Sequence, residues 1–175
     1  MKDILEASAT ELSAAIHARK VAPSEVMAAW LAQVAAVNGA VNAIVSLRDP
    51  DALMAEARAL DDAPPRGWLH GIPLPVKDLV ATKGLCTTWG APLYATHVPA
   101  KDDILAARMR AAGAIFPGKT NVPEWGQGSH SFNPIFGVTR NPYDLDLSAG
   151  GSSGGAAAAL AARLVAVADG SDMMG

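Results

Sequence analysis

The sequence has few of the side chains that most often build disulfides, metal sites or nucleic-acid contacts. It contains one cysteine and four histidines in 175 residues, which excludes an intramolecular disulfide and a zinc cluster built on cysteine. No two of the histidines have the spacing of metal ligands. Fourteen basic and 17 acidic residues give a formal net charge of −3, so we do not expect the basic face of a nucleic-acid-binding protein.

Long apolar runs are absent as well. The longest mainly apolar stretch, 156–168, is interrupted by Arg163 and is too short to span a bilayer. The N-terminus carries Lys2, Asp3 and Glu6 and lacks the apolar core of a signal peptide. We therefore expect a soluble cytoplasmic protein without membrane contacts. Apolar residues make up 50% of the chain, which fits a buried core and excludes a disordered chain.

Helix and strand patterns alternate along the chain, which predicts an α/β fold. Ser8 and Glu11 have capping-box spacing and predict a helix that ends near Lys20, and Ser24 is expected to cap a second helix. Further helices are predicted at 50–60, 103–112 and 156–163, and strands at 114–116 and 164–168. Between Trp125 and Gly155 there is almost no periodicity, so this segment is predicted to be a long, functional loop.

The most informative segment is Gly150–Gly155, which reads Gly-Gly-Ser-Ser-Gly-Gly directly before a predicted helix. Glycines let another group approach the backbone closely, and free amides at a helix start favour negative charge. Three interpretations compete: a flexible linker, a phosphate cradle and a catalytic serine loop. The segment lacks the Gly-Lys-Ser/Thr ending of a P-loop, so the evidence for a phosphate cradle is weak.

The same segment also matches G-x-S-x-G, the nucleophile elbow of α/β-hydrolases, with Ser153 as the nucleophile. That elbow needs a buried strand before it, but residues 141–148 are too polar for one. It also needs an acid and then a histidine downstream, and no histidine follows His130. We therefore regard this match as accidental.

Five segments, in their order and intervals, together resemble the amidase signature family. They are Gly71–Asp78, Gly118–Glu124, Asn141–Pro142, Gly150–Gly155 and Gly170–Asp172, and the resemblance covers most of the chain from His70 onward. It implies an α/β fold with a mixed β-sheet flanked by helices. It also implies an amidase that hydrolyses a carboxylic amide through a Ser–cis-Ser–Lys triad and an acyl-enzyme, with no cofactor and no metal.

The resemblance assigns roles to individual residues. Lys77 is implied as the base, and Ser152 as the bridging serine, joined to Gly151 by a cis peptide bond. Ser153 and Asp172 are implied as supports of the loops, although Ser153 could equally be a helix cap. The nucleophilic serine is expected directly after Gly175, outside the sequence.

Two further features of the site follow from the same resemblance. The backbone amides of Met173, Met174 and Gly175 are implied as an oxyanion hole, with the alternative that the two methionine side chains simply fill core space. Ser129 is a candidate for the substrate pocket.

The chemistry is consistent with a lysine base. A lysine accepts a proton only when it is neutral, so burial has to lower its pKa from about 10.4. Ile72, Leu74 and Val76 provide apolar surroundings for Lys77. The alternative is a surface lysine, or a salt bridge between Lys77 and Asp78.

The resemblance implies that 1–175 is the N-terminal part of a single catalytic domain, with a helical region at about 1–65 and a catalytic core segment at about 66–175. The expected partner is a small-molecule amide substrate, and a homodimer is compatible with the sequence. Two alternatives stay open. The chain could be the glutaminase subunit of a tRNA-dependent amidotransferase, which has a partner subunit, or a non-catalytic fragment or binding module if it truly ends at Gly175.

Overall fold

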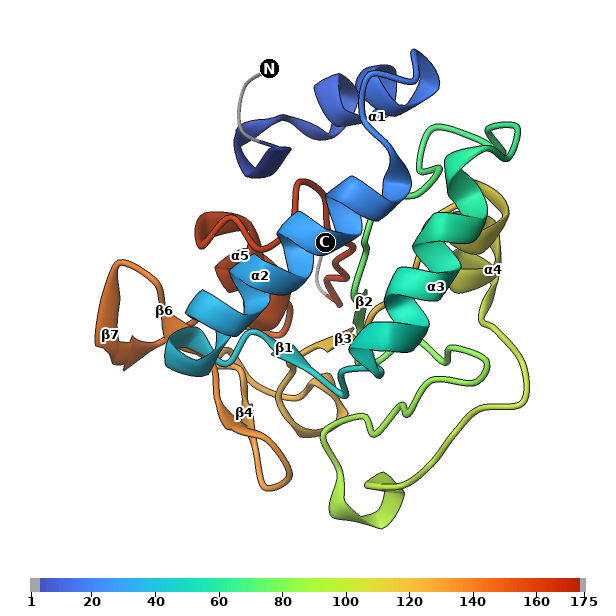
Figure 1. Ribbon diagram of the computed structural model, residues 1–175. Helices are drawn as coiled ribbons and strands as arrows, with labels where there is room; N and C mark the ends of the chain where they lie inside the picture. The colour runs from blue at the N-terminus through green and yellow to red at the C-terminus, as the bar shows by residue number, and fades with distance from the viewer. Residues whose placement is uncertain (1–3, 174–175) are drawn as a thin grey trace.

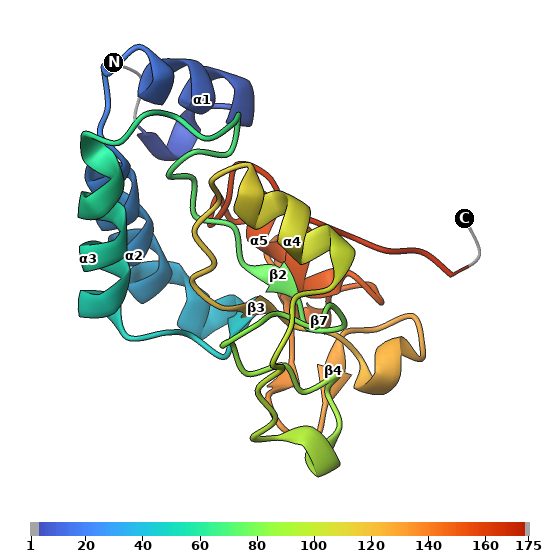
Figure 2. The same cartoon turned by 90° about the vertical axis from the view of Figure 1, so that its right-hand side faces the viewer.

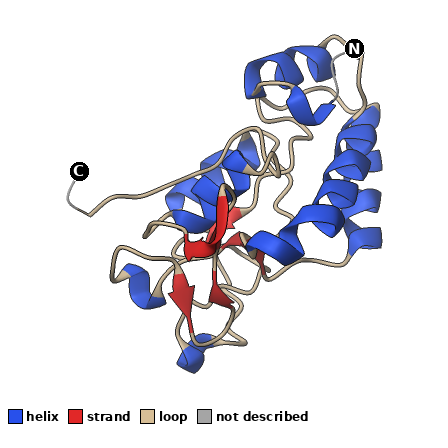
Figure 3. Cartoon of the chain, turned by 90° about the vertical axis from the view of Figure 1, so that its left-hand side faces the viewer, coloured by secondary structure: helices blue, strands red, loops and turns tan. Residues whose placement is uncertain are grey.

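A small mixed sheet lies at the centre of residues 4–173, the part of the chain that the computed structural model describes (Figures 1 and 3). Its strands are β1 (Ile44–Val45), β2 (Val76–Lys77) and β3 (Lys119–Thr120), in the order β1-β3-β2. β3 pairs antiparallel with β1 and parallel with β2. The predicted α/β class, with a mixed sheet flanked by helices, is therefore confirmed.

Five α-helices and three 3-10 helices surround this sheet in the described part. The α-helices are α1 (Ala9–His17), α2 (Pro23–Val41), α3 (Pro50–Asp61), α4 (Ile104–Ala111) and α5 (Gly154–Ala161). The 3-10 helices are η1 (Ile4–Glu6), η2 (Pro92–Tyr94) and η3 (Glu124–Gly126). α2 and α3 pack against each other on one flank of the sheet (Figure 2), and α5 contacts β1 and β3.

Two apolar clusters hold these elements together. One joins α2, α3, β1 and α5 and includes Met27, Ile44 and Leu53; the other joins α1, α4 and the segment before β2. Neighbouring Ile115 and Phe116 belong to different clusters, as the alternation of side chains along an extended backbone requires. Burial of each such side chain contributes about 1.5–3 kcal/mol, and the two clusters hold β1 through Ile44 and β2 through Val76.

The helix starts follow the sequence signals with two exceptions, at α2 and at α5, which begins at Gly154 instead of the predicted residue 156. The Ser8 hydroxyl accepts from the Glu11 amide and the Glu11 carboxylate accepts from the Ser8 amide, which confirms the capping box. The predicted cap at Ser24 is wrong, because α2 begins one residue earlier at Pro23, whose ring is pre-organised for the first helical position. Instead, the amide and the hydroxyl of Ser24 donate hydrogen bonds to the Asp61 carboxylate, at 2.9 and 2.7 Å.

Both predicted strands differ from the structure. At 114–116 only Ile115 forms an isolated bridge, to Pro73, and the paired strand β3 lies three residues further on. At 164–168 there is no strand, and no strand within 4–173 pairs with this segment. One edge of β2 pairs with β3. On the other edge the Lys77 amide donates a hydrogen bond to a side-chain atom, Asp169 Oδ1, at 2.9 Å.

The segment predicted to be a long loop contains two hairpins. They are β4 (Phe132–Asn133) with β5 (Gly137–Val138), and β6 (Arg140–Asn141) with β7 (Asp144–Ser148). These strands are short and largely exposed, so they show no apolar alternation in the sequence. β7 lies ahead of the serine segment but is exposed, so it is not the buried strand that a nucleophile elbow requires.

None of the helices in residues 4–173 is both long enough and apolar enough to cross a membrane.

Candidate active site

The Lys77 side chain is fully buried at the end of β2. Lys77 lies opposite Thr120 in the parallel pairing with β3, and its backbone amide is held by Asp169 on the other edge. Backbone bonds on both edges fix the direction in which the side chain leaves the strand. The burial that a lysine base requires is therefore present, and the alternative of a surface lysine is excluded.

Four oxygen atoms surround the Lys77 ammonium within hydrogen-bond distance. Nζ lies 2.9 Å from Ser152 Oγ and 2.7 Å from Ser153 Oγ. It lies 2.8 Å from Ser171 Oγ and 3.2 Å from the Ser171 carbonyl oxygen. An ammonium has only three hydrogens to donate, so these oxygens share them. The structure thus brings together Lys77 and both serines of the predicted pair, and it adds Ser171.

The serine segment is held in one conformation by contacts at both ends. The Gly151–Ser152 peptide bond is cis, as the resemblance implies. The hydroxyl of Ser131 donates to the Gly150 carbonyl at 3.1 Å and accepts from the Gly154 amide at 3.0 Å. A flexible linker does not fit a segment bonded in this way.

Ser153 stands at the N-cap position of α5, but its hydroxyl makes no capping bond. The hydroxyl accepts from Lys77 Nζ and from the Ser171 amide, and donates to the Ser171 carbonyl. Ser153 therefore links the lysine to the backbone at Ser171, and the alternative that it only caps the helix is wrong.

Burial lowers the pKa of Lys77 below the ordinary lysine value, because the charged form loses its hydration. The carboxylates of Asp169 and Asp172 act in the opposite direction and raise the pKa. The salt bridge with Asp78 that the sequence left open is not the arrangement found. Asp78 accepts from the Thr88 amide at 3.0 Å and from the Thr88 hydroxyl at 2.5 Å.

A second buried lysine lies next to this site. Lys119 precedes Thr120 on β3, and burial lowers its pKa to about 8, while Asp78 and Asp169 raise it. Its ammonium donates to the Val80 carbonyl at 2.6 Å and to Thr82 Oγ1 at 2.8 Å. Lys119 therefore holds the chain that follows Lys77.

Asp169 is the main feature that the sequence interpretation missed. Its Oδ1 accepts from the Lys77 amide, and its Oδ2 is buried without a partner among the described residues. Burial raises the pKa of this carboxyl group, and the two lysines, Lys119 and Lys77, lower it. Ser171 was also missed as a site residue, although it lies inside the segment Gly170–Asp172 that carries the resemblance.

A pocket of about 550 Å³ opens beside the two serines of the pair. Its lining includes Gly151, Ser152, Ser153, Ser171 and Asp172. These residues place hydroxyl groups and backbone amides around an open space, and such a surface can bind a small polar substrate.

The remaining predicted site residues lie elsewhere. Ser129 is exposed and does not line this pocket, although its backbone packs against Gly151. Met173 is 82% exposed, so its side chain does not fill core space. Met174 and Gly175 lie outside the described residues. Within 4–173 no group of three histidine, cysteine, aspartate or glutamate side chains could hold a metal ion.

Comparison with known proteins identifies the family. The chain is 41% identical to a glutamyl-tRNA(Gln) amidotransferase subunit of Acidothermus cellulolyticus, over 100% of this chain and 35% of that protein. It is 41% identical to an acylamidase of Rhodococcus erythropolis, over 96% of this chain and 36% of that protein. The peptide amidase of Stenotrophomonas maltophilia superposes with a TM-score of 0.83 at 35% identity, over 93% of this chain and 35% of that chain.

The chain thus spans about a third of the length of the relatives that it matches. The family model described as Amidase matches residues 25–175. On the sequence match, the shared fold and the serine-rich surroundings of a buried lysine, this chain belongs to the amidase family, the amidase-signature proteins that its five sequence segments resemble.

Proposed function

We propose that this chain supplies the base and the bridging serine of an amidase that hydrolyses carboxylic amides through an acyl-enzyme. The observation that carries the proposal is the position of Lys77 Nζ, buried and 2.9 Å from Ser152 Oγ. In this proposal residues 1–175 are the N-terminal part of one catalytic domain. The nucleophile is the serine that the resemblance puts directly after Gly175.

The proposed reaction begins with proton transfer away from the nucleophile. As the serine oxygen attacks the amide carbonyl carbon, its proton passes to Ser152 Oγ, and the proton of Ser152 passes to neutral Lys77 Nζ. A serine hydroxyl is a weak nucleophile until a base removes its proton. Ser152 can accept one proton while donating another, so it connects two groups that need not touch.

The same two residues then act in reverse. When the carbon–nitrogen bond breaks, Ser152 donates a proton to the leaving amine and recovers one from Lys77. Water then attacks the acyl-serine, and its proton passes through Ser152 to Lys77. As the acid leaves, the same route returns a proton from Lys77 to the nucleophilic serine, and Lys77 is neutral again. The implied oxyanion hole at the amides of Met173, Met174 and Gly175 would stabilise the negative charge on the carbonyl oxygen.

The surroundings of Lys77 support this role. Burial lowers the pKa of Lys77, which raises the fraction of neutral amine at neutral pH. Ser153 and Ser171 hold Nζ at 2.7 and 2.8 Å. In this proposal they orient the amine towards Ser152 while the nearby carboxylates keep it able to receive a proton.

A second candidate is the glutaminase subunit of a tRNA-dependent amidotransferase. It is favoured by the 41% identity to the glutamyl-tRNA(Gln) amidotransferase subunit of Acidothermus cellulolyticus. The chemistry at Lys77 and Ser152 would be the same, with glutamine as the amide. The two candidates differ in whether glutamine is hydrolysed and whether a partner subunit stimulates the reaction. Cytoplasmic location and a homodimer stay predictions of the sequence.

Substitution of Lys77 tests the proposal. In the complete gene product, Lys77→Met keeps an unbranched chain in the buried site but removes the base, so kcat on a chromogenic anilide should fall about 10²- to 10⁴-fold. Ser152→Ala should cause a comparable loss. Lys20→Met, at an exposed lysine between α1 and α2, is the matched control and should leave kcat unchanged. Hydrolysis by Lys77→Met at the rate of the control would overturn the proposal.

A further inference from the structure

A second cavity, of about 180 Å³, lies apart from the serine pocket and shares no lining residue with it. Three cationic side chains, Arg48, Lys83 and Arg110, border it, together with Glu56 and Phe116. They come from three parts of the chain: the loop after β1, the loop after β2, and α4. The proposed amidase mechanism uses none of them.

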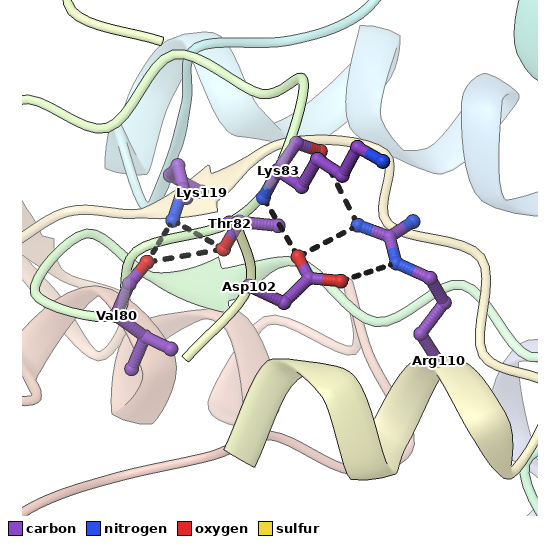
Figure 4. Close-up of polar contacts among 6 residues, drawn as sticks. All are labelled: Val80, Thr82, Lys83, Asp102, Arg110 and Lys119. Carbon is purple, nitrogen blue, oxygen red and sulfur yellow. Dashed lines mark hydrogen bonds and ion pairs between the residues drawn. The ribbon is translucent and has the colours of Figure 1, made fainter. Parts of the chain in front are cut away.

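Arg110 is held rigidly and still has hydrogens to donate. Its Nε and one terminal nitrogen donate to the two oxygens of Asp102, at 2.8 and 3.0 Å (Figure 4). The same terminal nitrogen donates to the Lys83 carbonyl at 3.3 Å. The guanidinium carbon lies 4.7 Å from the centre of the buried Phe116 ring. The second terminal nitrogen donates no hydrogen bond within residues 4–173.

Arg48 and Lys83 also have unused hydrogens. Arg48 donates a hydrogen bond from one terminal nitrogen to the Phe116 carbonyl at 2.9 Å, and from the other to Glu56 at 2.7 Å. Its Nε makes no hydrogen bond in the described chain. The Lys83 ammonium has no hydrogen bond or ion pair to any described residue, and it carries no dashed line in Figure 4. Three cations therefore face two carboxylates, Glu56 and Asp102, and one positive charge is uncompensated.

The loop that carries Lys83 is anchored from two sides. The Lys83 amide donates to Asp102 Oδ1 at 2.7 Å, so Asp102 holds both Arg110 and Lys83. The preceding residue, Thr82, accepts from the buried Lys119 ammonium through its hydroxyl (Figure 4). The Arg110 guanidinium and the backbone that carries Lys83 are thus held in place before any ligand enters, which reduces the ordering entropy lost on binding.

We propose that this cavity binds a phosphate group, either inorganic phosphate or the phosphate of a small phosphorylated molecule. A phosphate presents three or four acceptor oxygens, which suits unused donors from three elements. Arginine recognises phosphate through its planar array of N–H groups. The uncompensated positive charge at Lys83 favours an anionic ligand.

Calorimetric titration of the complete gene product with inorganic phosphate, at low ionic strength, tests the proposal. We expect saturable binding with one site per chain, weakened by added salt. Lys83→Gln removes the uncompensated charge without breaking a hydrogen bond and should weaken phosphate binding about fivefold to tenfold. Lys83→Glu should abolish it. Lys20→Gln and Lys20→Glu make the same changes of charge at an exposed lysine that borders a different cavity, and should leave the affinity unchanged.

Phenyl phosphate separates the two sources of the phosphate group. Binding at least as tight as that of inorganic phosphate indicates the phosphate of a larger molecule, whereas much weaker binding indicates the free ion. Absence of saturable phosphate binding, or equal effects of the Lys83 and Lys20 variants, would overturn the proposal. Because these titrations measure no hydrolysis, their outcome does not depend on the amidase proposal.

Discussion

Replacement of Gly155 by alanine should destabilise the protein strongly, because α5 packs directly against backbone at that residue. A Cβ atom at Gly155 would lie closest to the Asn121 nitrogen, 2.5 Å from the Asn121 oxygen and 2.8 Å from the Ala43 oxygen. The Gly155 amide also donates to the Asn121 carbonyl at 3.1 Å. The clash is thus with backbone next to β3 and β1, which cannot rotate away as a side chain can.

The magnitude follows from two opposing effects. Overpacking of a dense interior destabilises by about 1–3 kcal/mol, and contacts this short with fixed backbone place Gly155→Ala at the upper end. Alanine is favoured over glycine within a helix by about 1 kcal/mol at most. We therefore expect a net loss of about 2–3 kcal/mol in the free energy of unfolding, which lowers the Tm by about 4–12 °C for a chain of this size.

Gly39→Ala is a matched control, since it makes the same change in another helix. Gly39 lies in α2, is exposed, and would have no atom within 4 Å of an added Cβ. Only the helix propensity acts there, so Gly39→Ala should raise the free energy of unfolding by about 0.5–1 kcal/mol. Urea unfolding of both variants measures the two values. Equal effects of the two substitutions would refute the packing argument.

Three further predictions concern the surroundings of the site. Ser131→Ala leaves the Gly150 carbonyl and the Gly154 amide without their partner, and should lower the free energy of unfolding by about 1–3 kcal/mol in urea titrations; an unchanged midpoint would contradict it. Asp169→Asn removes a charge that raises the pKa of Lys77, so the acid limb of the pH profile of kcat/KM should move to lower pH; an unmoved limb would show that this charge does not act on the base. The pKa of Lys119 is about 8 in the fold against 10.5 ordinarily, so the unfolded chain binds more protons between these values and stability should rise with pH across that interval, by about 3 kcal/mol at most. Lys119→Met should reduce this rise, and the same pH dependence in that variant would refute the assignment.

Local signals in the sequence predicted most helices but not the strands. The capping box at Ser8, the helix at 50–60 and the helix at 103–112 depend on neighbouring residues, and the structure has α1, α3 and α4 there. The sheet strands β1, β2 and β3 have two residues each, too few to show an alternating pattern. Their pairing depends on contacts between distant segments, such as Val76 with Lys119.

The site was predictable only in part for the same reason. Lys77, Ser152 and Ser153 belong to segments that carry the family resemblance, and the structure brings them together. Asp169 lies in a segment whose sequence pattern predicted a strand ending beside it, so nothing local indicated that its carboxylate would reach the Lys77 amide, 92 residues away in the sequence. The arginine and lysine side chains around the second cavity likewise meet only through the tertiary fold.

The central claim is that Lys77 serves as a base because burial favours its neutral form. The most direct measurement is an NMR titration of the lysine side chains in the complete gene product, with the Lys77 signal assigned by its loss in Lys77→Met. We expect Lys77 to lose its proton at a pH below the ordinary lysine pKa of 10.5, the direction in which burial moves it. Loss of the proton at or above that pKa would contradict the claim.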